Sequence, residues 1–166
     1  TADSLFVDLE FNSDYARDSV DTKRLAYSID GKSLVFNGNT ERTYTKMESN
    51  EQDLDGAGMF GTRGPDTGQE RRGDSRDRKT LKFLMNGRFQ WIAYTTGSFK
   101  FSGTGGGSFV SKNGKSVELI EFFSRDDSRV GASLDFIYEV DGNDWHHKGK
   151  NSRGEPMYEI WMRRER

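Results

Sequence analysis

Cysteine is absent from the 166-residue chain, and proline occurs only at Pro65 and Pro156. The lack of cysteine excludes disulfides, thiolate metal sites and cysteine nucleophiles. No apolar stretch approaches the roughly 18 residues of a membrane-spanning helix, so we expect no transmembrane segment. The formal net charge is only -2, which argues against nucleic acid as a partner.

The residues that are present favour an all-β chain. Phe, Trp and Tyr make up 13 % of the sequence, and aromatic rings fill a core with few side chains. Apolar residues alternate on both sides of Asn86-Gly87, at Leu81, Phe83, Met85, Phe89, Trp91 and Ala93. Asn-Gly suits a two-residue type I′ turn, so this stretch predicts a β-hairpin. Further short strands around Asn113-Gly114 and Asp141-Gly142 predict a barrel or a sandwich.

Part of the sequence occurs twice. Adding 111 to the residue number carries one set of positions onto another, namely Glu10-Phe11 onto Glu121-Phe122, Tyr27 onto Tyr138, and Asp30-Gly31 onto Asp141-Gly142. With three more residues inserted in the second copy, the match continues from Glu41, Tyr44 and Met47 to Glu155, Tyr158 and Trp161. The repeat predicts a partial β unit at 1–47, the back half of a preceding barrel, then a linker at 48–53 and a complete barrel at 54–166.

Half a barrel exposes an unpaired strand edge and an apolar face. We therefore expect either that the missing half lies upstream in the natural protein or that residues 5–47 pair with the complete unit or with another chain. Self-association through this half-repeat is one of these options. The polar stretch 62–77 is predicted to be a long loop, and its alternating charges favour a solvated surface over a phosphate-binding patch.

Several short runs of the complete unit resemble a family of uncharacterised bacterial proteins described as membrane or secreted proteins. The runs are Lys79–Phe83, Asn86–Tyr94 and Gly103–Phe109, followed by Ile120–Ser124, Val130–Leu134, Asp144–Gly149 and Tyr158–Trp161. The resemblance implies an antiparallel lipocalin-like (calycin) barrel from about 54 to 166, secreted, periplasmic or at the cell surface. It brings no established activity. Such barrels open with Gly-x-Trp, and Gly56-Ala57-Gly58 lacks that tryptophan. No signal peptide is recognisable at Thr1, so we expect the chain to begin at a mature end or inside a longer precursor.

The candidate ligand-binding residues are those that a barrel interior would collect: Phe89, Trp91, Glu121, Phe136, Tyr138, Trp145, His147 and Tyr158. An eight-stranded barrel is either filled by side chains or holds one small ligand. Glu121 stands out because the repeat holds a glutamate in both copies, which also suits a structural carboxylate paired with Arg or Tyr. His146 and His147 are neighbours on a strand and point to opposite faces, so they do not chelate one metal.

Three functions remain open from the sequence. The first is a non-catalytic module that holds a small apolar or amphipathic molecule in the barrel, with no cofactor, no metal and no catalytic residue. The second is a structural or interaction repeat with a filled core. The third is a barrel enzyme that uses Glu121 with His147 or Tyr138. The run Gly103–Gly107 is not a phosphate loop, because a strand rather than a helix follows it.

Overall fold

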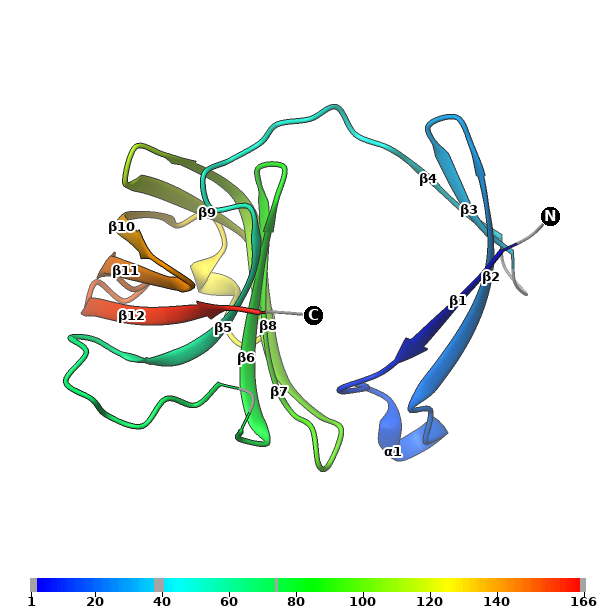
Figure 1. Cartoon of the computed structure of the whole chain (residues 1–166), viewed down its shortest axis with the longest axis horizontal. Helices are drawn as coiled ribbons and strands as arrows, with labels where there is room; N and C mark the ends of the chain where they lie inside the picture. Colours follow the sequence, from blue (N-terminus) through cyan, green and yellow to red (C-terminus); the bar gives the residue numbers. More distant parts are fainter. Residues whose placement is uncertain (1–2, 38–40, 74, 165–166) are drawn as a thin grey trace.

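The structure is a computed structural model that describes residues 3–37, 41–73 and 75–164. Its first part is an antiparallel sheet of four strands in the order β1-β2-β3-β4 (Figure 1). A one-turn helix, α1 (Tyr15–Asp18), lies between the first two strands. The strands are β1 (Asp3–Asp8), β2 (Thr22–Asp30), β3 (Ser33–Asn37) and β4 (Arg42–Thr45).

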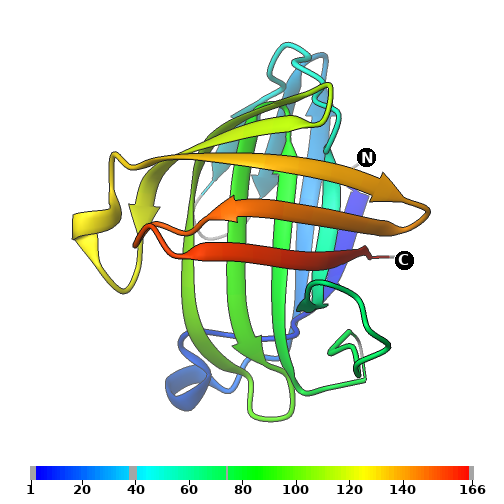
Figure 2. The same ribbon diagram turned by 90° about the vertical axis from the view of Figure 1, so that its left-hand side faces the viewer.

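The second part is a closed barrel of eight antiparallel strands (Figure 2), which confirms the predicted fold class. Each strand pairs with the next in the chain, and β12 pairs with β5, as in an up-and-down barrel. A 3-10 turn, η1 (Asp127–Arg129), precedes β10. The strands are β5 (Gly56–Arg63), β6 (Arg78–Met85), β7 (Arg88–Thr95), β8 (Lys100–Lys112), β9 (Lys115–Phe123), β10 (Ser133–Asp141), β11 (Asp144–Lys150) and β12 (Pro156–Arg163).

The two Asn-Gly pairs form the turns that the sequence predicts. Asn86 and Gly87 have φ of 57° and 76°, and Asn113 and Gly114 have 54° and 77°. Positive φ at both central residues is the type I′ geometry, which matches the twist of the flanking strands. The hairpins β6–β7 and β8–β9 follow from these turns.

The repeat is visible in the strand pairing. In the first sheet Leu5 pairs with Leu25, and Tyr27 with Phe36. At positions higher by 111, the barrel pairs Ser116 with Phe136 and Tyr138 with His147. The sheet β1–β4 therefore reproduces β9–β12, which is half of the barrel.

The predicted alignment of the fourth strand was wrong by three residues. Leu34 pairs with Tyr44, whereas its counterpart Trp145 pairs with Trp161. Tyr44 therefore stands where Trp161 stands, and not where Tyr158 does. The turn between β11 and β12 is longer than the sequence match indicated, because residues 151–155 form a hydrogen-bonded loop there.

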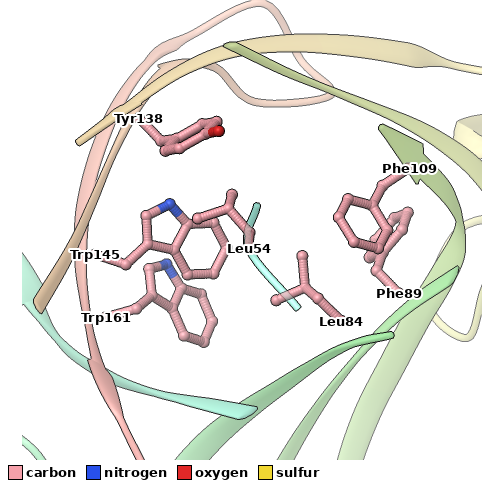
Figure 3. Close-up of a cluster of buried hydrophobic side chains, with 7 residues drawn as sticks. All are labelled: Leu54, Leu84, Phe89, Phe109, Tyr138, Trp145 and Trp161. Carbon is pink, nitrogen blue, oxygen red and sulfur yellow. The ribbon is translucent and has the colours of Figure 1, made fainter. Parts of the chain in front are cut away.

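Buried side chains in the barrel lie in two clusters. The main cluster points into the interior (Figure 3) and consists of Leu54, Leu84, Phe89, Phe109, Tyr138, Trp145 and Trp161. A smaller cluster of Met59, Leu81 and Tyr94 is covered by Phe11 from the segment after β1. Next to Phe11, Glu10 accepts hydrogen bonds from Tyr94 and Arg164. The segment between β1 and α1 is thus attached to the barrel.

The apolar alternation in β6 does not mark the inward face of the strand. The sequence pattern placed Leu81, Phe83 and Met85 together on one face, and in the structure these three residues do lie on the same face. That face is the outer one, where Phe83 is 45 % exposed and Met85 70 % exposed. Lys82 and Leu84 point inward and are buried. The outer surface of this barrel is partly apolar, so hydrophobicity alone does not mark the inner face.

Glycine in β8 permits the close approach of β9. A β-bulge lies between Gly106 and Gly107, where Gly107 pairs with Ile120 and Gly106 with Phe122. A Cβ atom on Gly107 would lie 2.0 Å from the carbonyl oxygen of Leu119. Backbone atoms have little freedom to move away, so this position requires glycine.

The substitution Gly107→Ala is expected to lower the free energy of unfolding by at least about 1–3 kcal/mol, the usual effect of overpacking. Gly58→Ala is the matched control, because its Cβ would lie 3.5 Å from its nearest neighbour, in ordinary contact. Urea unfolding followed by tryptophan fluorescence measures both. Equal losses for the two variants would contradict this explanation of the bulge.

Candidate functional site

The two ends of the barrel differ. At one end the last residues before β5 close the interior: Leu54 belongs to the core cluster, and its amide donates to the hydroxyl of Ser111 at 3.0 Å. Beside it, the Tyr138 hydroxyl donates to Asp53 at 2.7 Å. The other end holds a cavity of about 550 Å³, which is within the usual range for small-molecule sites.

Four arginines line this cavity, and strand ends place them there. Arg63 ends β5, Arg78 begins β6, Arg125 follows β9, and Arg72 lies in the loop between β5 and β6. In the described part of the chain, no ion pair joins any of the four to a carboxylate. The lining also contains two carboxyl groups, Glu70, which pairs with Arg76, and Glu159, which attracts Arg63. The four arginines exceed them, so the lining carries positive charge that a ligand can meet.

Aromatic rings lie under two of these cations. The guanidinium of Arg72 is 5.6 Å from the centre of the Phe60 ring, and that of Arg125 is 5.9 Å from the Trp91 ring. Arg125 also donates to the carbonyl of Ser102 at 3.0 Å. Such cation–π contacts hold a guanidinium against an aromatic wall. The cavity thus combines positive charge with aromatic surface.

The inner wall of the cavity carries a partly buried carboxyl group. Glu159 lies beside Trp161, whose indole nitrogen donates to it at 3.1 Å. Burial raises the pKa of Glu159, and the attraction of Lys82 opposes this only in part. The carboxyl group therefore stays protonated to a higher pH than an exposed glutamate, which reduces negative charge next to the arginines.

Deeper in the barrel, Lys82 and Glu118 form an ion pair, and each side chain is only 6 % exposed. The Lys82 ammonium also lies 5.2 Å from the Phe89 ring and 5.3 Å from the Trp145 ring. A buried charge needs such partners, since its transfer from water is unfavourable. The pair and these rings lie in the middle of the barrel.

His147 occupies the same interior. The centre of its ring lies 3.9 Å from the centre of the Phe136 ring and 4.8 Å from that of Trp145. Neither ring nitrogen has a hydrogen-bond partner among the described residues, and the same holds for Ser116 Oγ and Trp145 Nε1. Burial, with a smaller contribution from Lys82, holds the pKa of His147 well below its ordinary value.

The residues predicted for the site are spread over several places. Trp91 is the one member that lines the cavity. Phe89, Phe136, Tyr138, Trp145 and His147 are buried in the interior. Tyr158 lies on the outer side of β12, where its hydroxyl is 2.9 Å from His146 Nδ1.

The predicted partnership of Glu121 with His147 or Tyr138 is corrected by the geometry. Ser116, Glu118 and Ile120 are the buried residues of β9, so Glu121 points outward. There it binds Arg88 at 2.7 Å, with 43 % of its side chain exposed. The carboxylate is thus on the opposite side of the barrel wall from both proposed partners.

The sequence interpretation did not single out Arg125, Lys82, Glu118 or Glu159, and it took the arginine-rich loop that holds Arg72 to be a solvated surface rather than a binding patch. No sequence signal placed Lys82 and Glu118 inside, because apolar residues stand on both faces of β6 and of β9. Only the structure shows that the inner neighbours, Leu84 and Ile120, are the buried ones. Arg63, Arg72 and Arg78 lie in or beside the loop between the paired strands β5 and β6, and the curvature of the sheet brings Arg125, which follows β9, to the same rim.

No family model matches the chain, and no curated protein matches it. No helix among the described residues is both long and apolar enough to cross a membrane. In the same residues, no group of three or more His, Asp and Glu side chains is arranged to hold a metal ion.

Removing one partner of the buried pair should be strongly destabilising. Lys82→Met is expected to lower the free energy of unfolding by about 3–5 kcal/mol, because Glu118 is left buried without its cation. Adding Glu118→Leu removes the unpaired charge and should restore most of the loss. Urea unfolding of both variants tests this, and a double variant less stable than the single one would contradict it.

The depressed pKa of His147 predicts a loss of stability in mild acid. Below pH 6.5, the unfolded chain binds a proton that the folded barrel does not, so stability falls toward the lower folded pKa by up to about 1.4 kcal/mol per pH unit. His147→Phe, which copies Phe36 of the first sheet, should flatten this slope between pH 7 and 5. Ser116→Ala is the control, because it leaves the imidazole in place and should keep the same slope of stability against pH. Equal slopes in urea unfolding of wild type and His147→Phe would contradict the assignment.

Proposed function

We propose that the chain is a non-catalytic binding module for a small amphipathic molecule that carries an anionic group and an aromatic or apolar body. The observation that carries the proposal is the cavity of about 550 Å³ at one barrel end, lined by four arginines and by Phe60, Trp91 and Trp161. The Lys82–Glu118 pair and the buried aromatic side chains lie in the interior below this cavity, which favours the rim as the place for a ligand.

The arginines of the cavity favour a ligand with an anionic group. Guanidinium forks bind carboxylate, sulfonate or phosphate in two-point contacts. Arg63 and Arg78, at the facing ends of β5 and β6, have no ion pair with a carboxylate in the described residues. A neutral or cationic ligand would leave this positive charge uncompensated when the cavity closes around it.

The aromatic wall of the cavity favours a ligand with an apolar body. Trp91 and Trp161 offer flat surfaces on the inner side of the cavity, next to Trp161's contact with Glu159. Aromatic faces pack well against a planar ligand and contribute large apolar area. This combination supports a binding module over a spacer repeat, for which a solvated rim without such a cavity would suffice. Export to the periplasm or cell surface stays a prediction.

Self-association through β1–β4 is the second part of the proposal. Leu5 is 44 % exposed and Tyr44 49 % exposed on this four-stranded sheet. In the described part of the chain, no strand pairs with the free edge of β1 or of β4. Open edges and apolar faces of this kind promote association.

Ligand binding can be tested with a matched pair of probes, 2-naphthoate and the neutral 2-naphthylmethanol. Naphthoate should raise the melting temperature and quench tryptophan fluorescence, while the alcohol should have little effect, since binding to the folded state stabilises it. Arg78→Gln should raise the Kd for naphthoate about tenfold, the value of one charged hydrogen bond.

Arg88→Gln is the control, because it removes the same charge from the outer wall, where Arg88 binds Glu121. It should leave the Kd for naphthoate unchanged. Equal affinity for the two probes, absence of binding at millimolar concentration, or an equal effect of the two arginine variants would overturn the proposal.

A further inference from the structure

The sheet β1–β4 is half of a barrel whose other half is not in the described chain. Its strands match β9–β12 in order and, from β1 to β3, in register. In the barrel, β9 pairs with β8 and β12 pairs with β5. The corresponding edges of β1 and β4 pair with no described strand. The structure of the second copy therefore shows what kind of element these edges fit, namely an antiparallel strand on each side.

The inward side of the half-barrel is apolar in its middle, and the charged residues Asp3, Lys23 and Arg42 lie near strand ends of the same face, where they are exposed. The positions that match the barrel interior hold Leu5, Val7, Leu25, Tyr27, Leu34, Phe36 and Tyr44. Val7 stands where the barrel has Glu118, and Phe36 where it has His147. The rings of Phe36 and Tyr44 pack edge to face, with their centres 5.8 Å apart. An apolar middle with charges confined to the strand ends is suited to a packed core rather than to a ligand.

We propose that a second copy of this chain supplies the missing half, so that two β1–β4 sheets close one shared eight-stranded barrel around a twofold axis. This inference rests on the self-association proposed above and names its partner and geometry. β1 and β4 run in opposite directions, because three antiparallel steps separate them. A twofold rotation about the barrel axis keeps strand directions, so β4 of the partner lies antiparallel to β1, and both seams form at once.

The surroundings of the sheet fit a partner at this place. In Figure 1 the concave side of the sheet is turned toward the closed barrel, and β6 and β7 lie on the barrel side nearest to it. On the outer face of β6, Phe83 and Met85 are 45 % and 70 % exposed. The outer side of β1 carries Phe6, 72 % exposed. The partner's sheet between the two would bury apolar surface on both of its faces.

The test combines the molar mass in solution, measured by light scattering, with amide hydrogen exchange. Light scattering of the whole chain over a range of concentrations should give a dimer that dissociates on dilution. In the dimer, β1 and β4 should both be protected from amide exchange, because the amides on their open edges, about half of each strand, become paired. Dilution to monomer should remove this protection while that of β9–β12 stays.

Two variants with matched exposure locate the interface. Tyr44→Glu places a charge in the shared core twice, and should raise the dimer Kd about 100-fold or more. Val130→Glu alters a residue that is 47 % exposed, close to the 49 % of Tyr44, but lies after η1 on the closed barrel. It should leave the Kd unchanged. The tryptophans all lie in the closed barrel, so their fluorescence reports whether it remains folded.

The outcomes separate the two proposals. A monomer at every concentration would overturn both, and would leave the open face to strands from outside this chain. A dimer in which β1 and β4 stay unprotected, or in which Tyr44→Glu has no larger effect than Val130→Glu, would overturn the shared barrel and leave self-association standing.

Discussion

Hydrogen bonding between β12 and β5 is the constraint on which the rest of the structure depends. It joins the last strand to the first and leaves the eight-stranded sheet without an edge. One face of every strand then becomes an interior. The sheet β1–β4 repeats half of the same strands without such closure, and its equivalent face stays partly exposed at Leu5 and Tyr44. Closure, rather than local sequence, therefore separates a core from an open surface.

The enclosed interior accounts for the electrostatics of the site. Away from water, Lys82 must pair with Glu118 and lie against aromatic rings. The same burial lowers the pKa of His147 and raises that of Glu159. These groups and two of the tryptophans lie in the middle of the barrel, and the arginine-lined cavity lies at one of its ends. The proposed function follows from this division between a buried centre and a charged rim.

The glutamate shared by the two copies belongs to the scaffold. Glu10 accepts hydrogen bonds from Tyr94 and Arg164 and attaches the first segment to the barrel. Glu121 binds Arg88 on the outer wall. Both stand outside the interior and are bound by an arginine. The residues that differ between the copies, such as Val7 and Glu118, carry the distinct chemistry of the complete barrel.

The sequence by itself determined the all-β class, the Asn-Gly hairpins and the internal repeat, because turn geometry and strand alternation are local properties. It also placed Phe89, Trp91, Tyr138 and Trp145 among the inward residues. It did not identify the inner face of β6, where apolar Phe83 and Met85 point outward and charged Lys82 points inward. Nor did it assemble the rim from Arg63, Arg72, Arg78 and Arg125. Only the tertiary structure decided these points, because closing the barrel selects which side of each strand is enclosed and brings distant strand ends to one opening.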